Sequence, residues 1–225
     1  MLRKWFAIFK KDTLMDRAYR RSFLIFDNIR EMFATARESL RNMEDSEIGI
    51  DIYSKDAEIN RFEREVRRNV FNHLAVVGPA RLPSGLVLVS IIIDIERIGD
   101  YTKNIVELAM NHPGKLHGAK YEEDLQRVEA AVEDSIIRTK NCFESADDAS
   151  ALKLLEEYEW VNPVCDESLM GLVKEEDKSI RPGDAVSLGL YFRWLKRINS
   201  HLRNIVTSVV NPFDKIGFKP KTLKS

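Results

Sequence analysis

The sequence has few cysteines, no long apolar run and no excess of charge of either sign. Its two cysteines, Cys142 and Cys165, have neither CxxC spacing nor the number of a disulfide framework, which fits a reducing compartment. The longest apolar run, Leu86 to Ile95, is interrupted by Ser90 and Asp94 and falls short of the roughly 18 residues that span a bilayer. Basic and acidic residues, 35 against 36, lack the basic surplus of a nucleic-acid-binding protein. We therefore expect a cytoplasmic globular protein without a nucleic-acid partner.

Glycine and proline are also missing from long stretches of the chain. Neither occurs in residues 1–48 or 119–162, and both gather in short clusters at 78–85, 111–118 and 181–184. Between these clusters the sequence lacks the alternation of apolar and polar residues that is typical of strands. The distribution predicts an all-α protein with long helices.

Apolar residues at steps of three and four predict where the helices lie. We expect six of them, at Met15–Met43, Ile52–His73, Ser84–Met110, Tyr121–Phe143, Ala149–Glu175 and Ala185–Val210. The third opens after Pro83, with Ser84 as a plausible N-cap, and is apolar almost all round at its start. Such a helix belongs in the middle of a bundle.

An internal repeat relates the two halves of the chain. The segment IERIGDYTKNIVEL (95–108) aligns without gaps on LKRINSHLRNIVTS (195–208), and each segment follows a turn that contains proline and glycine. The offset predicts a duplicated three-helix unit. We expect one three-helix bundle in residues 1–112 and a second, with a basic tail, in residues 119–225, joined by NHPGKLHG (111–118).

Oxygen-bearing side chains form a stripe on the third predicted helix. Glu96, Asp100 and Asn104 are four residues apart, so each advances only about 40° around the helix. Asp56 and Asn60 show the same spacing on the second predicted helix. If the two helices are neighbours, these groups converge. Desolvated carboxylates are costly unless a cation neutralises them.

Two interpretations of these acids follow from the residues alone. An oxygen-rich set without cysteine suits Mg, Ca, Mn or ferric iron. Alternatively, the acids pair with Arg61, Arg64, Arg97 or Lys103 on a solvated surface, because ExxxD is a common pattern on exposed helices. Spacing alone leaves both open.

The string DIERIGDYTKNIVELA (94–109) resembles the signature helix of the PhoU family, and KDAEINRFEREV (55–66) is similar to the second-helix motif of that family. This resemblance implies two three-helix bundles that bind iron or zinc clusters at their surface. It implies Asp56, Asn60, Glu96, Asp100 and Asn104 as the ligands, although Asn60 replaces an acid of the family pattern. Mn, Mg and Ca stay as alternative metals.

The second repeat departs from this pattern. Lys196 and Ser200 stand where the first repeat has Glu96 and Asp100. We therefore expect the metal site to be lost there, with Lys196 providing the positive charge in its place.

The resemblance also implies a function, namely a non-enzymatic adaptor that regulates phosphate transport and phosphate signalling. Its implied partners are a component of a phosphate transporter, either an ABC ATPase subunit or a sodium-coupled carrier, and a sensor histidine kinase. A homodimer and a peripheral position at the inner face of the membrane are further expectations.

Two other functions stay open on the sequence, a metal-free helical scaffold and a carboxylate-bridged di-metal enzyme. The enzyme is disfavoured because no ExxH, GxSxG or phosphate-loop motif is present. The N-terminal RKWFAIFKK (3–11) either folds back on the bundle through its aromatic residues or touches a membrane or transporter.

Overall fold

The computed structural model of the chain describes residues 14–43, 51–78 and 81–221. Every regular element within these ranges is a helix, which confirms the predicted all-α class. The predicted contacts of RKWFAIFKK lie outside the described residues. None of the described helices combines the length and the apolar composition needed to cross a membrane.

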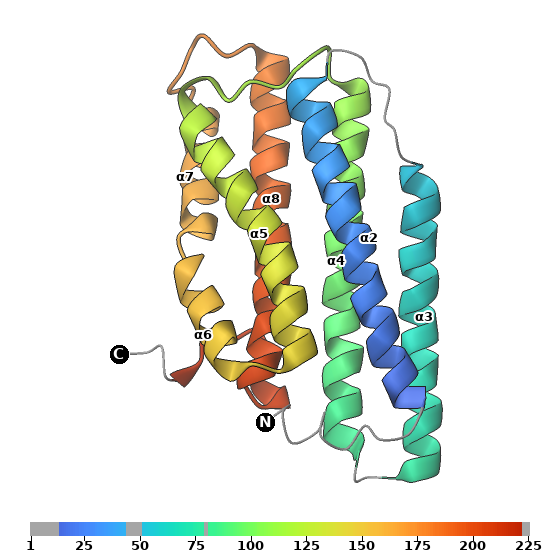
Figure 1. Cartoon of the computed structure of the whole chain (residues 1–225). Coiled ribbons are helices and arrows are strands. Elements are labelled where there is room, and N and C mark those ends of the chain that lie inside the picture. The colour runs from blue at the N-terminus through green and yellow to red at the C-terminus, as the bar shows by residue number, and fades with distance from the viewer. Residues whose placement is uncertain (1–13, 44–50, 79–80, 222–225) are drawn as a thin grey trace.

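The first three helices, α2 (Leu14–Asn42), α3 (Ile52–Val77) and α4 (Leu82–Asn111), pack into one bundle (Figure 1). The predicted stripe on α2 is buried, as the spacing requires. Its buried members are Met15, Ala18, Ser22, Ile25, Ile29, Met32 and Ala36. Met43 was expected to extend this stripe, but it follows the end of α2 and is exposed.

The start of α4 differs from the prediction. Ser84 is not the N-cap, because the helix already begins at Leu82 and includes Pro83 in its first turn. Proline is tolerated there, since the first-turn N–H groups have no partner within the helix. The Ser84 hydroxyl instead donates a hydrogen bond to the carbonyl oxygen of Arg81 at 3.0 Å.

The second half of the chain forms another helical bundle. Its helices are α5 (Glu122–Ser145), α6 (Asp148–Glu157), α7 (Val161–Val173) and α8 (Pro182–Val210). The single helix predicted over 149–175 was wrong, because it is divided at residues 158–160 into α6 and α7. Pro163 explains the break: in a continuous helix its ring would clash with the preceding turn, whereas in the first turn of α7 it costs no hydrogen bond.

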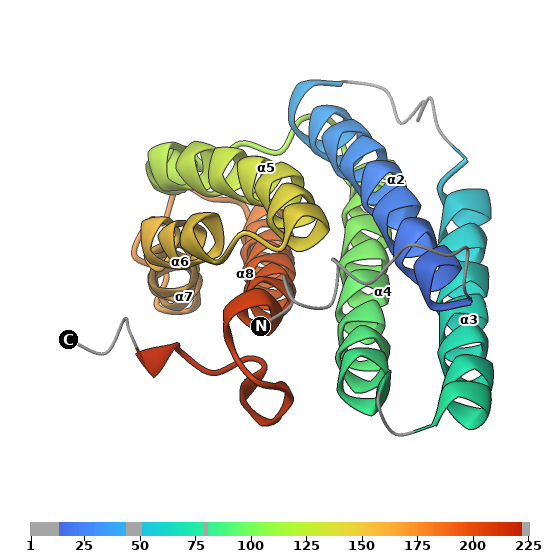
Figure 2. The ribbon, with the colours of Figure 1, turned by 60° about the horizontal axis from the view of Figure 1, so that its bottom comes forward.

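Helices α4 and α8 lie side by side, with α2 and α3 beyond one of them and α5, α6 and α7 beyond the other (Figures 1 and 2). They run antiparallel: Asp94, in the first half of α4, contacts His201 in the second half of α8, whereas His112, just after α4, contacts Asp184 at the start of α8. Apolar residues of both bundles form one continuous core. The predicted central position of the apolar third helix is confirmed.

The connection between the bundles is packed against both of them. Leu116 is fully buried, and its backbone N–H donates to the carbonyl oxygen of Leu40 at 2.9 Å. His112 places one ring nitrogen 2.7 Å from the Gly114 carbonyl oxygen and the other 3.2 Å from Asp184. A short 3-10 helix, η2 (Ala119–Tyr121), then leads into α5, and η3 (Phe213–Lys215) follows α8.

A buried arginine joins the two bundles. Arg41, near the end of α2, forms ion pairs with Glu122 and Glu129 of α5, the second at 3.1 Å, and donates a hydrogen bond to the Leu116 carbonyl oxygen. The Tyr191 hydroxyl of α8 donates to Glu129 at 2.8 Å. Burial raises the pKa of Glu129, and Arg41 opposes that rise. Arg41 thus joins α2 to α5 and to the connection, and Glu129 extends this cluster to α8.

We expect Arg41→Ala to lower the free energy of unfolding by about 3 to 5 kcal/mol, because it leaves the Glu129 carboxylate buried without its cation. Urea unfolding followed by circular dichroism measures this loss. Arg37→Ala is the matched control, since Arg37 lies one turn earlier and its ion pair with Glu133 is more exposed. The control should lose about 1 kcal/mol or less. Equal losses in the two variants would contradict the central role of Arg41.

Candidate functional site

The candidate site is the groove between α3 and α4, where the two helices approach closely at a glycine. Gly99 is buried, and a Cβ atom at this position would lie 3.0 Å from the Cδ1 atom of Ile59. The absence of a side chain at Gly99 therefore lets α3 pack tightly against α4. This contact lies at the level of Asn60 on α3 and Asp100 on α4, so it brings the two predicted motifs face to face.

Lys103 bridges the two helices in this groove. Its ammonium group lies 3.0 Å from the Oδ2 atom of Asp56, and the same oxygen accepts a hydrogen bond of 3.3 Å from the Asn60 amide. Burial alone would lower the pKa of Lys103, but the hydrogen bond to Asp56 and nearby carboxylates raise it above its usual value. The positive charge next to Asp56 is therefore that of Lys103, a side chain of the protein itself.

Glu96 and Asp100 line the α4 side of the groove. Asp100 pairs with Arg97 at 2.9 Å, while Glu96 lies farther from that guanidinium, at 3.5 Å. Burial raises the pKa of Glu96 above its usual value; Asp100 adds to the rise and Arg97 opposes it. Glu63 and Asp56, across the groove on α3, raise it further. The acids of both helices thus lie close enough to repel one another.

The groove has the chemistry of a site for a hard cation but not its geometry. Asn104 lies half-buried one turn beyond Asp100, and its side chain makes no hydrogen bond to a described residue. Among the residues that the structure describes, no three His, Cys, Asp or Glu side chains converge in a way that would hold a metal ion. In this arrangement Lys103 lies against Asp56, so a metal ion could use that carboxylate only after displacing the ammonium group. Metal binding by the five predicted residues stays a prediction.

The equivalent groove of the second bundle contains an ion pair. Lys196 of α8 lies 2.5 Å from Asp166 of α7, so a lysine provides positive charge there, as the sequence predicts. Ser200, which replaces the second acid, accepts a hydrogen bond of 3.1 Å from the Asn162 amide. Both grooves therefore contain a lysine of the central helix paired with an aspartate of its neighbour.

A polar cluster in the seam between α4 and α8 was not identified from the sequence. Asp94 accepts a hydrogen bond from Asn204 at 3.0 Å and lies 2.7 Å from a ring nitrogen of His201. The ring of Tyr101 stacks on His201, and its hydroxyl accepts from Arg197 at 3.2 Å. Two features of the sequence pointed to this cluster. Asp94 interrupts the apolar run, and His201 occupies the position in the second segment of the repeat that Tyr101 occupies in the first.

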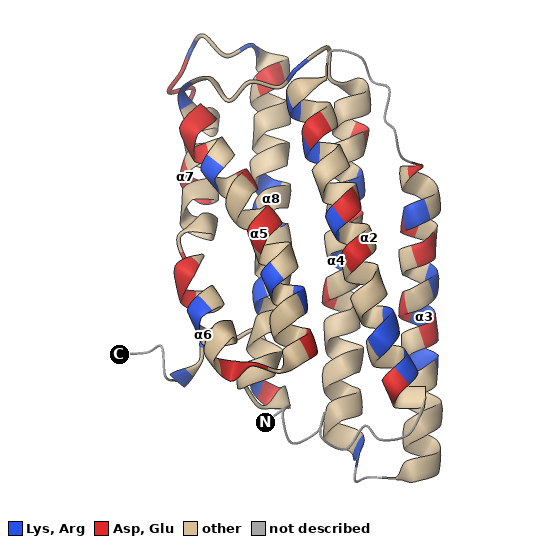
Figure 3. Cartoon of the chain, viewed as in Figure 1, with Lys and Arg blue, Asp and Glu red and all other residues tan. Residues whose placement is uncertain are grey.

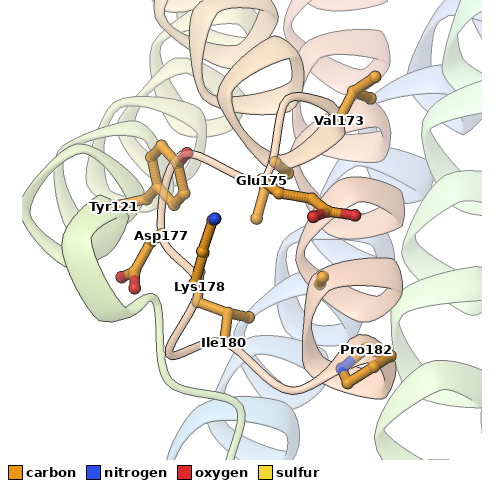
Figure 4. A pocket seen from close by; sticks show the side chains of 9 residues that line it. Tyr121, Val173, Glu175, Asp177, Lys178, Ile180 and Pro182 are labelled. Carbon is orange, nitrogen blue, oxygen red and sulfur yellow. The ribbon is translucent and has the colours of Figure 1, made fainter.

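A separate pocket of about 480 Å³ lies in the second bundle, between the end of α7 and the start of α8 (Figure 4). Tyr121, Val173 and Ile180 give it apolar walls, while Glu175 and Lys178 bring charges of opposite sign. None of the predicted site residues lines it. The pocket is therefore distinct from the α3–α4 groove.

The fold and the groove define a class, namely all-α proteins of two helical bundles that pack through antiparallel central helices. Residues 24–109, which span most of α2, all of α3 and nearly all of α4, match the family model of the PhoU domain. This match confirms the predicted resemblance to the PhoU family. A comparison with curated protein sequences finds no match.

Two solved structures share the fold of nearly the whole chain. PhoU from Pseudomonas aeruginosa is 21% identical with a TM-score of 0.78, and the similarity covers 88% of this chain and 95% of that one. The phosphate transport system regulatory protein PhoU from Streptococcus pneumoniae is 16% identical with a TM-score of 0.75, over 87% of this chain and 93% of that one. The second bundle, outside the matched domain, therefore has the expected architecture as well.

We expect Glu96→Gln to raise the melting temperature at neutral pH in buffer with chelator, because it removes a carboxylate that burial and its neighbours disfavour. A raised pKa in the folded state means that Glu96 favours folding most below its unfolded pKa and loses this contribution as pH rises through the folded pKa. The gain should therefore vanish in acid. Glu58→Gln, at a more exposed carboxylate of α3, is the control. A gain that persists unchanged in acid would refute the assignment.

Proposed function

We propose that the chain is a non-enzymatic regulator of phosphate transport. The observation that carries this proposal is the match of residues 24–109 to the PhoU domain, joined to the likeness of the whole fold to two PhoU structures. One of these is described as a phosphate transport system regulatory protein. Fold alone does not specify function, so the matched domain has the greater weight.

The surroundings of the two cysteines and of two histidines support a role without catalysis. Burial raises the pKa of Cys142, and it raises the pKa of Cys165 to about 12, so both thiols stay protonated at neutral pH. His112 is held between the connection and α8, and His201 lies in the α4–α8 seam. These groups take part in packing between segments, which suits an adaptor whose surfaces bind other proteins.

The adaptor would contact a phosphate transporter component, either an ABC ATPase subunit or a sodium-coupled carrier, and a sensor histidine kinase. Purified chain immobilised on a sensor surface and exposed to each candidate in turn distinguishes them. Binding to a transporter component is the expected result. Binding to none of the three would remove the adaptor mechanism while leaving the fold assignment intact.

Deleting the gene in its native host should uncouple phosphate uptake from phosphate supply. Without the regulator, we expect uptake rates of radiolabelled phosphate in phosphate-rich and phosphate-poor medium to converge. Reintroducing the wild-type gene should restore the difference. A deletion strain that regulates uptake normally would overturn the proposed function.

We further propose that the α3–α4 groove binds a metal ion in competition with Lys103. The donors would be Asp56, Glu96 and Asp100, with the amide oxygens of Asn60 and Asn104. Burial, together with the nearby carboxylates of Asp100, Glu63 and Asp56, raises the pKa of Glu96, so added positive charge in the groove would favour its ionised form. A hard cation such as Mg or Mn, or an iron or zinc ion, would supply this charge.

Elemental analysis after supplementation with Mg, Ca, Mn, Fe and Zn tests this proposal. We expect wild-type protein to retain metal. The Lys103→Gln variant should retain more, because the competing ammonium group is gone. The double variant Glu96→Ala with Asp100→Ala should remain folded and retain none. Asp166→Ala, in the equivalent groove of the second bundle, is the control and should match the wild type. No metal in either wild type or Lys103→Gln would favour the metal-free scaffold. Turnover of a phosphoester or of dioxygen by metal-loaded protein would favour the di-metal enzyme.

A further inference from the structure

Exposed apolar side chains gather at the end of the first bundle where α3 stops and α4 starts. We call this surface the α3–α4 tip; its members are Phe71, Val76, Val77, Leu82 and Leu86. Phe71 is 72% exposed and Val76 is 85% exposed, although both are large apolar residues. The ends of α3 and α4 that form the tip protrude at the bottom of Figure 1 and are largely free of charged residues in Figure 3.

The beginning of α2 lies beside this tip. Arg21 of α2 pairs with Glu65 of α3 at 3.3 Å, and Lys55 of α3 pairs with Glu31 of α2, so the two helices are antiparallel. Leu14, the first residue of α2 and also exposed, is therefore level with the last turns of α3.

Arginines that form no ion pair within the described part of the chain border the apolar tip. Arg64 and Arg68 are exposed on α3, and their spacing from Phe71 places all three on one face of that helix. Arg81 occupies the position just before α4. None of these three arginines forms an ion pair with a described residue. The surface thus combines exposed apolar groups with uncompensated positive charge.

We propose that the α3–α4 tip docks on an anionic lipid surface. Apolar side chains would enter the boundary between headgroups and acyl chains, and the guanidinium groups would bind lipid phosphates. The apolar residues are exposed around the adjoining ends of α3 and α4, where they could enter a lipid surface. The charge that borders them is positive, which is complementary to anionic lipid. This inference rests on the tip alone and does not require the phosphate-transport role.

Flotation of the full chain with vesicles tests the proposal. Wild-type protein should bind vesicles of phosphatidylcholine mixed with phosphatidylglycerol, bind phosphatidylcholine alone at least about tenfold more weakly, and lose binding as salt rises. Phe71→Asp with Val76→Asp should weaken binding at least about tenfold. Arg64→Gln with Arg68→Gln should weaken it about fivefold for each arginine. Arg64 and Arg68 are exposed, so their replacement should leave the fold unaffected.

The matched control is Val173→Asp with Val186→Asp, which introduces the same charges at residues 68% and 63% exposed in the second bundle. The control should bind anionic vesicles like the wild type, and circular dichroism should show every variant folded. Absence of wild-type binding overturns the proposal, as does equal binding by wild type and tip variants. If the tip variants instead change only the oligomeric state seen by light scattering, the tip is a contact between copies of the chain and the lipid proposal fails.

Discussion

The buried guanidinium of Arg41 is the interaction on which the relation between the two bundles depends. It reaches from α2 to Glu122 and Glu129 of α5 and to the backbone of the connection, and Tyr191 of α8 completes the cluster. Taking a carboxylate out of water is costly unless it stays paired and hydrogen-bonded, so the cluster is stable only when all its segments are in place. That requirement holds α5 and α8 against α2, and the direct packing of α4 on α8 forms the rest of the contact between the bundles.

Within each bundle, the central helix and one neighbour face each other with opposite charges. In the first bundle Gly99 permits the close approach, and Lys103 meets Asp56; in the second, Lys196 meets Asp166. The first groove contains more carboxylates than the second, and its Glu96 is disfavoured as an anion. The two equivalent grooves thus differ in charge. In the second groove Lys196 neutralises Asp166, whereas the first groove has further carboxylates besides the one that Lys103 neutralises. These further carboxylates are the physical basis of the proposed metal binding.

Much of the fold was predictable because long amphipathic helices leave a regular trace in the sequence. The stripe on α2, the central position of α4 and the duplication all followed from apolar spacing and the 100-residue offset. The errors lie at helix ends. Ser84 was expected to cap α4 because serine is a common N-cap, yet Pro83 fits the first turn and the helix starts earlier. The break before α7 had a local signal in Pro163, which directly follows the stretch 119–162 that lacks proline and glycine.

For the site, residue spacing places Asp56, Glu96 and Asp100 on faces that meet, because helical periodicity is a local property of the chain. Which cation lies among them is not local. Lys103 reaches Asp56 across 47 positions, and Asp94 meets His201 across 107, only because tertiary packing brings α3, α4 and α8 together. Periodicity specifies the face that a side chain occupies. The partner on the opposite face depends on the register and spacing of two packed helices, and α3 and α4 approach closely because Gly99 has no side chain.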